Sequence, residues 1–171
     1  VGIDQYTGEI AKLSNAVNDA RAVGDLLEHK YGFDQVHRLY DADATQAAIL
    51  DYLRDTLPSQ MGKQDRLVIF FSGHGVSRKG HLDELYGYLA PQDAKSGRYA
   101  SYLDMTELQR ACGWMPAKHV LLILDCCFSG VAAVTGRADL AQGPSILDDV
   151  YLQRITTRGA WQVLTASASD E

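Results

Sequence analysis

The fold is decided by the stretch RLVIFFSGHG, residues 66–75. Its first six residues, 66–71, are almost all apolar and have the length of a strand, and such a run predicts a strand that is covered on both faces. The stretch HVLLIL, residues 119–124, has the same character and predicts a second buried strand. Each run ends abruptly in small, polar or sulfur-containing residues. The functional residues are therefore expected where these two strands end.

The segments around these runs predict helices and further short strands. Apolar side chains recur at helical spacing from Ala16 to Tyr31, and Gly32 stands where a C-terminal cap is expected. A second helix is expected to begin at Thr45 and to stop at Pro58. Residues 104–107 resemble a capping box that opens a helix through about residue 111. Strands are also expected at residues 1–3, 36–40 and 161–166, and the Gly-rich, charged segment after residue 75 is expected to form a loop.

This alternation of strands and helices predicts an α/β fold, a mainly parallel sheet flanked by helices on both faces, in a single domain over residues 1–171. In such sheets, sites form beyond the carboxyl ends of the strands. His74 and Cys127 lie just past the ends of the two most apolar strands. If those strands are neighbours, the two side chains emerge at the same edge and can face one another.

Composition narrows the class of partner. The formal net charge is -6, and the Lys and Arg residues are scattered, which argues against nucleic-acid binding. No apolar run approaches the roughly 20 residues that a membrane span needs. Three cysteines, two of them adjacent, make a poor disulfide framework and favour a reducing, cytoplasmic compartment. Because strands are expected at both ends, the chain is interpreted as part of a longer protein with further domains, and residues 131–158 as a long mobile linker.

The residues at the two strand ends can hydrolyse a peptide bond. Such a reaction needs a thiolate that attacks the carbonyl carbon, an acid that protonates the leaving amine, and donors for the oxyanion. We expect Cys127 to attack and His74 to transfer the proton. The backbone N–H groups of Gly75 and Cys127 are expected to hold the oxyanion.

The spacing of these residues carries a family resemblance. SGHG at residues 72–75 is followed 53 positions later by DCCFSG at residues 125–130, and this pair resembles the caspase and metacaspase superfamily. The caspase form, with Gln-Ala before the Cys, is absent, and the second loop is similar to the metacaspase form Asp-Ser-Cys-His-Ser-Gly. This likeness implies that Cys127 is the nucleophile and that Cys126 takes the Ser position. Residues 13–20 are also similar to a metacaspase segment that contains Asn-Asp-Ala.

The same resemblance implies a substrate class. The aspartates that match Asp19 and Asp125 line the family's pocket for the residue before the cleaved bond. Two carboxylates in a concave site pair with a guanidinium or ammonium group, so cleavage of protein or peptide substrates after Arg or Lys is implied. Calcium-dependent metacaspases have an aspartate cluster, which Asp104 resembles; however, Met105 stands where a second aspartate is expected and Val134 lies near another. A thioether is a poor calcium ligand, so no cofactor is expected, and calcium remains an open but weakly supported alternative.

The linker suggests self-processing. Caspases are cut between their large and small subunits at the corresponding place, and Arg137, Arg154 and Arg158 suit a protease that prefers basic residues. We therefore expect self-cleavage after one of these arginines.

Structural interpretations stand beside these functional ones. His74 can be a loop residue, Cys127 a small buried apolar residue, Asp19 a partner of the helix dipole and Asp125 a loop cap. A zinc site of His74 with Cys126 and Cys127 is disfavoured, because adjacent cysteines rarely reach one tetrahedral ion. The alternative function is that of a catalytically inactive scaffold or recruitment module, which would need neither His74 nor Cys127.

Overall fold

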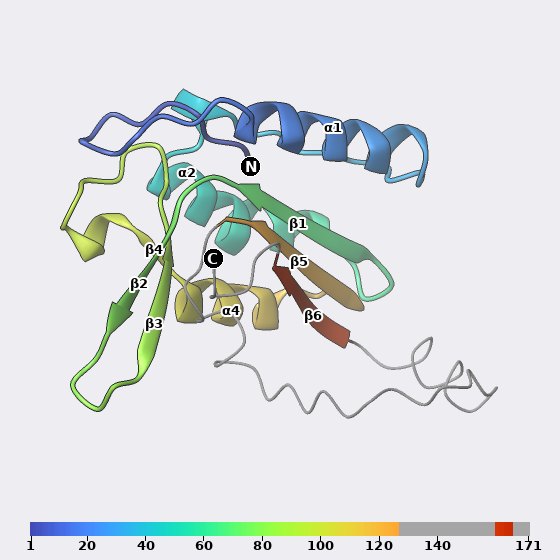
Figure 1. Cartoon of the computed structure of the whole chain (residues 1–171). Helices are drawn as coiled ribbons and strands as arrows, with labels where there is room; N and C mark the ends of the chain where they lie inside the picture. The colour runs from blue at the N-terminus through green and yellow to red at the C-terminus, as the bar shows by residue number, and fades with distance from the viewer. Residues whose placement is uncertain (127–159, 166–171) are drawn as a thin grey trace, which may run out of the picture.

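The computed structural model describes residues 1–126 and 160–165 (Figure 1). Its helices are α1 (Ala16–His29), α2 (Gln46–Asp51), α3 (Leu57–Gln60) and α4 (Met105–Trp114), with short helical turns η1 (Asp41–Asp43), η2 (Tyr52–Thr56) and η3 (Tyr99–Ser101). Its strands are β1 (Arg66–Ser72), β2 (Gly75–Lys79), β3 (Leu85–Leu89), β4 (Leu103–Asp104), β5 (His119–Asp125) and β6 (Ala160–Thr165). The predicted linker, residues 131–158, lies outside the described residues.

The two apolar runs are neighbouring strands, which meets the condition for His74 and Cys127 to follow strands that end at the same edge. β1 and β5 pair in parallel from Arg66↔His119 to Ser72↔Asp125, and β6 pairs in parallel with the other edge of β5. This three-stranded sheet has the order β1-β5-β6, and helices pack against it. The predicted α/β class with a mainly parallel sheet is therefore confirmed.

The core lies on one face of this sheet. Alternate residues of β5, namely Val120, Leu122 and Leu124, are buried, and the register places them opposite alternate residues of β1. Ile49 of α2 and Leu108 of α4 belong to the same buried cluster. The residues between them on β5 are only partly buried, and β6 is mostly exposed among the described residues.

The chain before α1 extends the sheet beyond β1. Gly2 forms parallel bridges to both Tyr40 and Ser72, and the N–H of Ile3 donates to the carbonyl of Ser72 at 3.1 Å. The strands expected at residues 1–3 and 36–40 are therefore present only as single bridges. α1 packs tightly on this segment, since a Cβ at Gly2 would lie 2.7 Å from the carbonyl oxygen of Ala16. The start of α1 is in this way fixed beside the end of β1.

A second sheet occupies the segment that was expected to be a loop. β2, β3 and β4 form an antiparallel sheet that projects from the parallel one (Figure 1). The prediction was wrong because β2 carries Ser77, Arg78 and Lys79 and so has no apolar run. Its strand structure comes from pairing with β3, in a register that runs from Gly75↔Leu89 to Lys79↔Leu85.

Helix boundaries differ from the sequence prediction in two places. Thr45 does cap α2, accepting a hydrogen bond from the N–H of Ala48 at 3.2 Å. The helical run does not stop at Pro58, however, because η2 and α3 carry it to Gln60. Pro58 lies at the junction of η2 with the start of α3, one of the first positions of that short helix. α4 is capped by Asp104 and continues to Trp114, beyond the expected end at residue 111. Within the described residues, no helix is both long and apolar enough to cross a bilayer.

Candidate active site

The ends of β1 and β5 are tied together by side-chain and backbone hydrogen bonds. Ser72, which is 3% exposed, donates its hydroxyl proton to Oδ2 of Asp125 at 2.9 Å. The N–H of Gly73 donates to the carbonyl oxygen of Asp125 at 3.3 Å. The loops that leave the two strands therefore start from one fixed point at the edge of the sheet.

His74 stands at this edge with its imidazole anchored on one side. Its Nε2 lies 2.8 Å from the carbonyl oxygen of Ala11. A carbonyl oxygen can only accept, so Nε2 carries the proton and, in the neutral ring, Nδ1 keeps the lone pair. The backbone of His74 is held as well: its N–H donates to Oη of Tyr6 at 2.9 Å, and its carbonyl accepts from the N–H of Ala90 at 2.9 Å.

The register of the sheet relates His74 to Cys127. Every β1–β5 pair is offset by 53 residues, as in Arg66↔His119 (119 − 66). His74 and Cys127 are separated by the same number, 127 − 74 = 53. Cys127 lies outside the described residues, as do Arg137, Arg154 and Arg158. Cys126, its neighbour in sequence, directly follows β5 and is buried, with 7% exposure.

The two aspartates of the predicted pocket come from separate elements that meet near this edge. Asp125 ends β5, and Asp19 is an exposed residue in the first turn of α1. The start of α1 packs on Gly2, which itself bridges to Ser72, the partner of Asp125. Among the described residues, no hydrogen bond or ion pair links Asp19 to Asp125.

The position of α1 depends on a remote cap. Asn15, the residue before the helix, makes no side-chain capping bond. The carboxylate of Asp4 instead accepts from the N–H of Ala16 at 2.9 Å and of Val17 at 3.3 Å. A carboxylate at a helix N-terminus satisfies free N–H groups and complements the helix dipole. Asp4 thereby holds the turn that carries Asp19.

The described residues give no side-chain cluster suited to a metal. No group of three or more His, Cys, Asp or Glu side chains is placed to bind an ion within residues 1–126 and 160–165. Asp104, which resembles a calcium-binding aspartate of the family, accepts from the N–H of Thr106 at 2.7 Å and serves as a helix cap. Val134 lies outside the described part.

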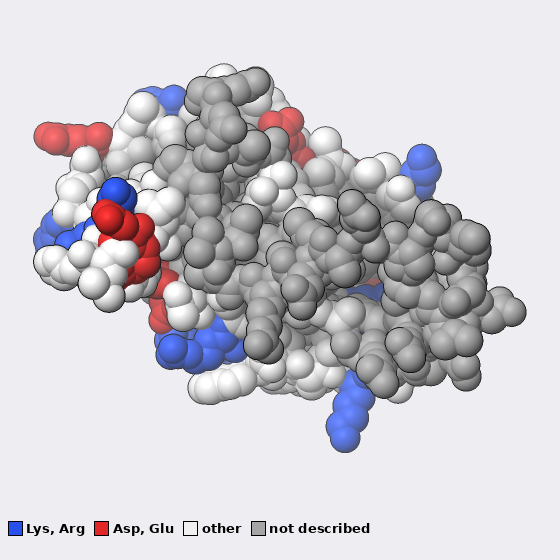
Figure 2. Space-filling view, turned by 60° about the horizontal axis from the view of Figure 1, so that its bottom comes forward, with Lys and Arg blue, Asp and Glu red and all other residues white. Residues whose placement is uncertain are grey.

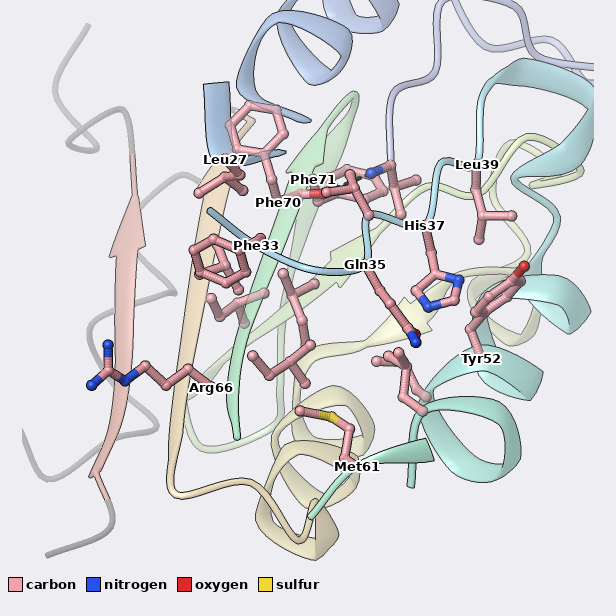
Figure 3. A pocket seen from close by; sticks show the side chains of 18 of the residues that line it. Leu27, Phe33, Gln35, His37, Leu39, Tyr52, Met61, Arg66, Phe70 and Phe71 are labelled. Atoms are coloured by element: carbon pink, nitrogen blue, oxygen red, sulfur yellow. Dashed lines mark hydrogen bonds between the residues drawn. The ribbon is translucent and has the colours of Figure 1, made fainter. Parts of the chain in front are cut away.

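A cavity in the described part of the chain lies away from His74. It measures about 440 Å³ and is bordered by α1, β1 and η2, with Leu27, Phe70 and Tyr52 among its lining side chains (Figure 3). Neither His74 nor Asp125 lines it. His74 and Asp125 therefore lie at an edge of the described sheet, outside this cavity.

Charged side chains are mixed over the described surface. In Figure 2, acidic and basic side chains lie next to one another at the left of the view, and other Lys or Arg side chains stand singly, away from acidic ones. Ion pairs such as Arg38 with Asp25 and Lys79 with Asp83 follow the same mixed pattern.

Sequence reasoning missed the role of four residues at this site. The Ala11 carbonyl is a backbone group, so no side-chain pattern identifies it. Tyr6 and Asp4 act over long sequence separations, on His74 and on the start of α1. Ser72 was noted only as part of the SGHG motif, although it holds Asp125.

Comparison with known proteins places this geometry in context. A family model described as Caspase domain matches residues 1–168. A crystal structure of protein GSU0716 from Geobacter sulfurreducens is similar, with a TM-score of 0.62 and 24% sequence identity, over 76% of this chain and 49% of that one. This likeness shows a shared fold, and the chain spans about half the length of that solved chain. No curated protein matches the sequence.

The Ser72–Asp125 hydrogen bond gives a stability prediction. Ser72→Ala removes the hydroxyl but keeps the Cβ, and it should lower the free energy of unfolding by about 1–3 kcal/mol, because a partly buried carboxylate loses its donor. Urea unfolding measures the change. Ser59→Ala is the control, since its hydroxyl donates to the Thr56 carbonyl at an exposed site and should matter less. Equal losses in the two variants would show that the bond across the strand ends is not special.

Proposed function

The chain belongs to the caspase-domain family of cysteine peptidases, and we propose that it is an endopeptidase that uses Cys127 as nucleophile and His74 as proton carrier. The observation that carries this proposal is the anchoring of the His74 ring at the end of β1, beside the strand that leads to Cys127 with the same 53-residue offset. Since the ring is held through Nε2, its Nδ1 is the nitrogen that would accept the thiol proton.

The proposed reaction follows from these positions. Nδ1 of His74 takes the thiol proton of Cys127, and the thiolate attacks the carbonyl carbon of the peptide bond. The backbone N–H groups of Gly75 and Cys127 stabilise the oxyanion. The imidazolium then protonates the leaving amine, and water, activated by the same ring, hydrolyses the acyl-enzyme. The Ala11 carbonyl supports the imidazolium by accepting from Nε2 throughout.

Labelling identifies the nucleophile. A peptide that carries Arg before a thiol-reactive warhead should label the wild-type protein, and Cys127→Ala should abolish the label. His74→Ala should slow labelling by about 100-fold or more, since general-base assistance contributes about that factor. Cys126→Ala is the matched control and should still be labelled. Label that persists in Cys127→Ala but is lost in Cys126→Ala would reassign the nucleophile, and no labelling of any form would favour an inactive scaffold.

We further propose that Asp19 and Asp125 select a basic residue before the cleaved bond. Asp125 ends the strand that precedes Cys127, and Asp19 stands on the turn of α1 that packs beside Ser72 through Gly2. Two carboxylates at this edge would bind a guanidinium or ammonium by charge-assisted hydrogen bonds. Proteins and peptides with exposed Arg or Lys are therefore the proposed substrates, and the proposal needs no cofactor.

A peptide series tests this specificity. Substrates that differ only in having Arg, Lys, Ala or Asp before the cleaved bond should be hydrolysed in that order of kcat/KM. Asp19→Asn and Asp125→Asn should each lower kcat/KM for the Arg substrate by at least about tenfold, since a hydrogen bond to a charged group contributes about 1.5–3 kcal/mol. Asp55→Asn, an exposed carboxylate remote in sequence from both loops, is the control and should have no effect. Preference for Asp substrates would refute the assignment.

Self-processing is the regulatory part of the proposal. The arginines Arg137, Arg154 and Arg158 lie in the segment between β5 and β6, and cleavage after any of them fits the proposed specificity. Mass spectrometry of active protein should find fragments that end at one of these residues, and Cys127→Ala protein should stay intact. The triple variant R137Q/R154Q/R158Q should also stay intact, whereas Arg110→Gln should not prevent cleavage. An intact chain in fully active protein would exclude self-cleavage as the activating step.

A further inference from the structure

His74 is held from one side by a single segment of the chain, residues 4–13. The Ala11 carbonyl holds the ring nitrogen, and Tyr6 contacts both the backbone and the ring. The Tyr6 hydroxyl accepts the N–H of His74 at 2.9 Å, and the two ring centroids lie 5.3 Å apart at an interplanar angle of 43°. Tyr6 is therefore the only described side chain for which both a hydrogen bond and a ring contact to His74 are recorded.

Tyr6 reaches His74 because the intervening residue has no side chain. A Cβ at Gly73 would lie 3.0 Å from the Tyr6 hydroxyl and 3.1 Å from the ring of Phe71. Such contacts are too close for most neighbours to accommodate without a shift. The glycine before His74 thus serves the approach of Tyr6, in addition to any approach of substrate.

The segment that carries Tyr6 is itself fixed at several points. The N–H groups of Asp4 and Gln5 both donate to Oδ1 of Asp41, at 2.7 and 2.9 Å. The N–H of Thr7 donates to the Gln92 carbonyl at 3.0 Å. Asp41 adopts a positive φ of 42°, which only a well-braced position sustains in a residue other than glycine. The segment from which Tyr6 contacts His74 is therefore itself held in place.

The hydroxyl of Tyr6 stays protonated at any pH at which a peptidase would work. Burial is the largest cause of a rise in its pKa to about 12, and the N–H of His74 opposes this rise. The phenol therefore acts as a neutral dipole and acceptor. It is a support for His74 and not a proton donor to substrate.

We propose that Tyr6 is a positioning residue for His74: its hydroxyl fixes the backbone and its ring fixes the imidazole, so that Nδ1 faces the attacking thiol. This inference rests on the proposed peptidase function. Because a displacement of about 1 Å at a catalytic group can reduce rate by about 100-fold, a brace of this kind affects the chemical step more than substrate binding.

Tyr6→Phe tests the role by removing the acceptor and keeping the ring. The variant should lower kcat by about tenfold and leave KM within about twofold, the pattern expected when an interaction acts on the transition state. In ¹H–¹⁵N NMR spectra, the backbone amide signal of His74 should shift, because its N–H loses the Tyr6 hydroxyl as acceptor. Tyr102→Phe is the matched control, since Tyr6 and Tyr102 are both 8% exposed. Tyr102→Phe should change neither kcat nor the His74 signals.

The outcomes separate the two levels of the proposal. A wild-type kcat and unaltered His74 signals in Tyr6→Phe would overturn the positioning role of Tyr6 without affecting the peptidase proposal. Equal losses of kcat in Tyr6→Phe and Tyr102→Phe would do the same. Wild-type protein without Cys127-dependent cleavage would instead refute the peptidase function, while the NMR comparison would still decide the role of Tyr6. If Tyr6→Phe fails to fold, hydrogen exchange of the unsubstituted protein provides the test. The backbone amide of His74 should exchange at least about 100-fold more slowly than an exposed amide. An unprotected His74 amide would overturn the inference.

Discussion

The parallel pairing of β1 with β5 is the constraint on which the rest of the structure depends. It fixes a constant offset between two distant parts of the sequence and ends with Ser72 opposite Asp125. The hydrogen bond between these two side chains locks the ends of the strands together at the point where both chains leave the sheet. Because every later residue starts from that point, the pairing determines which loop residues can meet.

The N-terminal segment supports the same edge of the sheet through further hydrogen bonds. Asp4 caps α1, Tyr6 supports His74, and Ala11 binds the imidazole, so three functions come from eight consecutive residues. Gly2 joins this segment to the end of β1 through its bridge with Ser72. The helix that carries Asp19 and the loop that carries His74 are in this way held by one short stretch of chain.

The sequence predicted the elements whose signal is local and strong. β1 and β5 were evident as continuous apolar runs, α1 from its helical periodicity, and His74 from its motif. Contacts made by backbone groups were not predictable, because the Ala11 carbonyl carries no side-chain signature. The cap of α1 was missed since Asp4 acts from far outside the helix, whereas capping patterns concern the adjacent residue, here Asn15.

Other elements escaped prediction because tertiary context decides them. β2 is polar along most of its length and is a strand only because it pairs with β3, where Arg78 also lies over the ring of Tyr99 at 4.7 Å.

A crosslinking experiment with the short bifunctional alkylating agent 1,3-dibromoacetone measures whether the loops that follow β1 and β5 meet as this fold implies. It should join Sγ of Cys127 to a ring nitrogen of His74, with loss of two bromide ions, in a crosslinked peptide pair detected by mass spectrometry. A Cys127 that is alkylated without reaching His74, or a bridge that starts from Cys126, would contradict the convergence of the two strand ends.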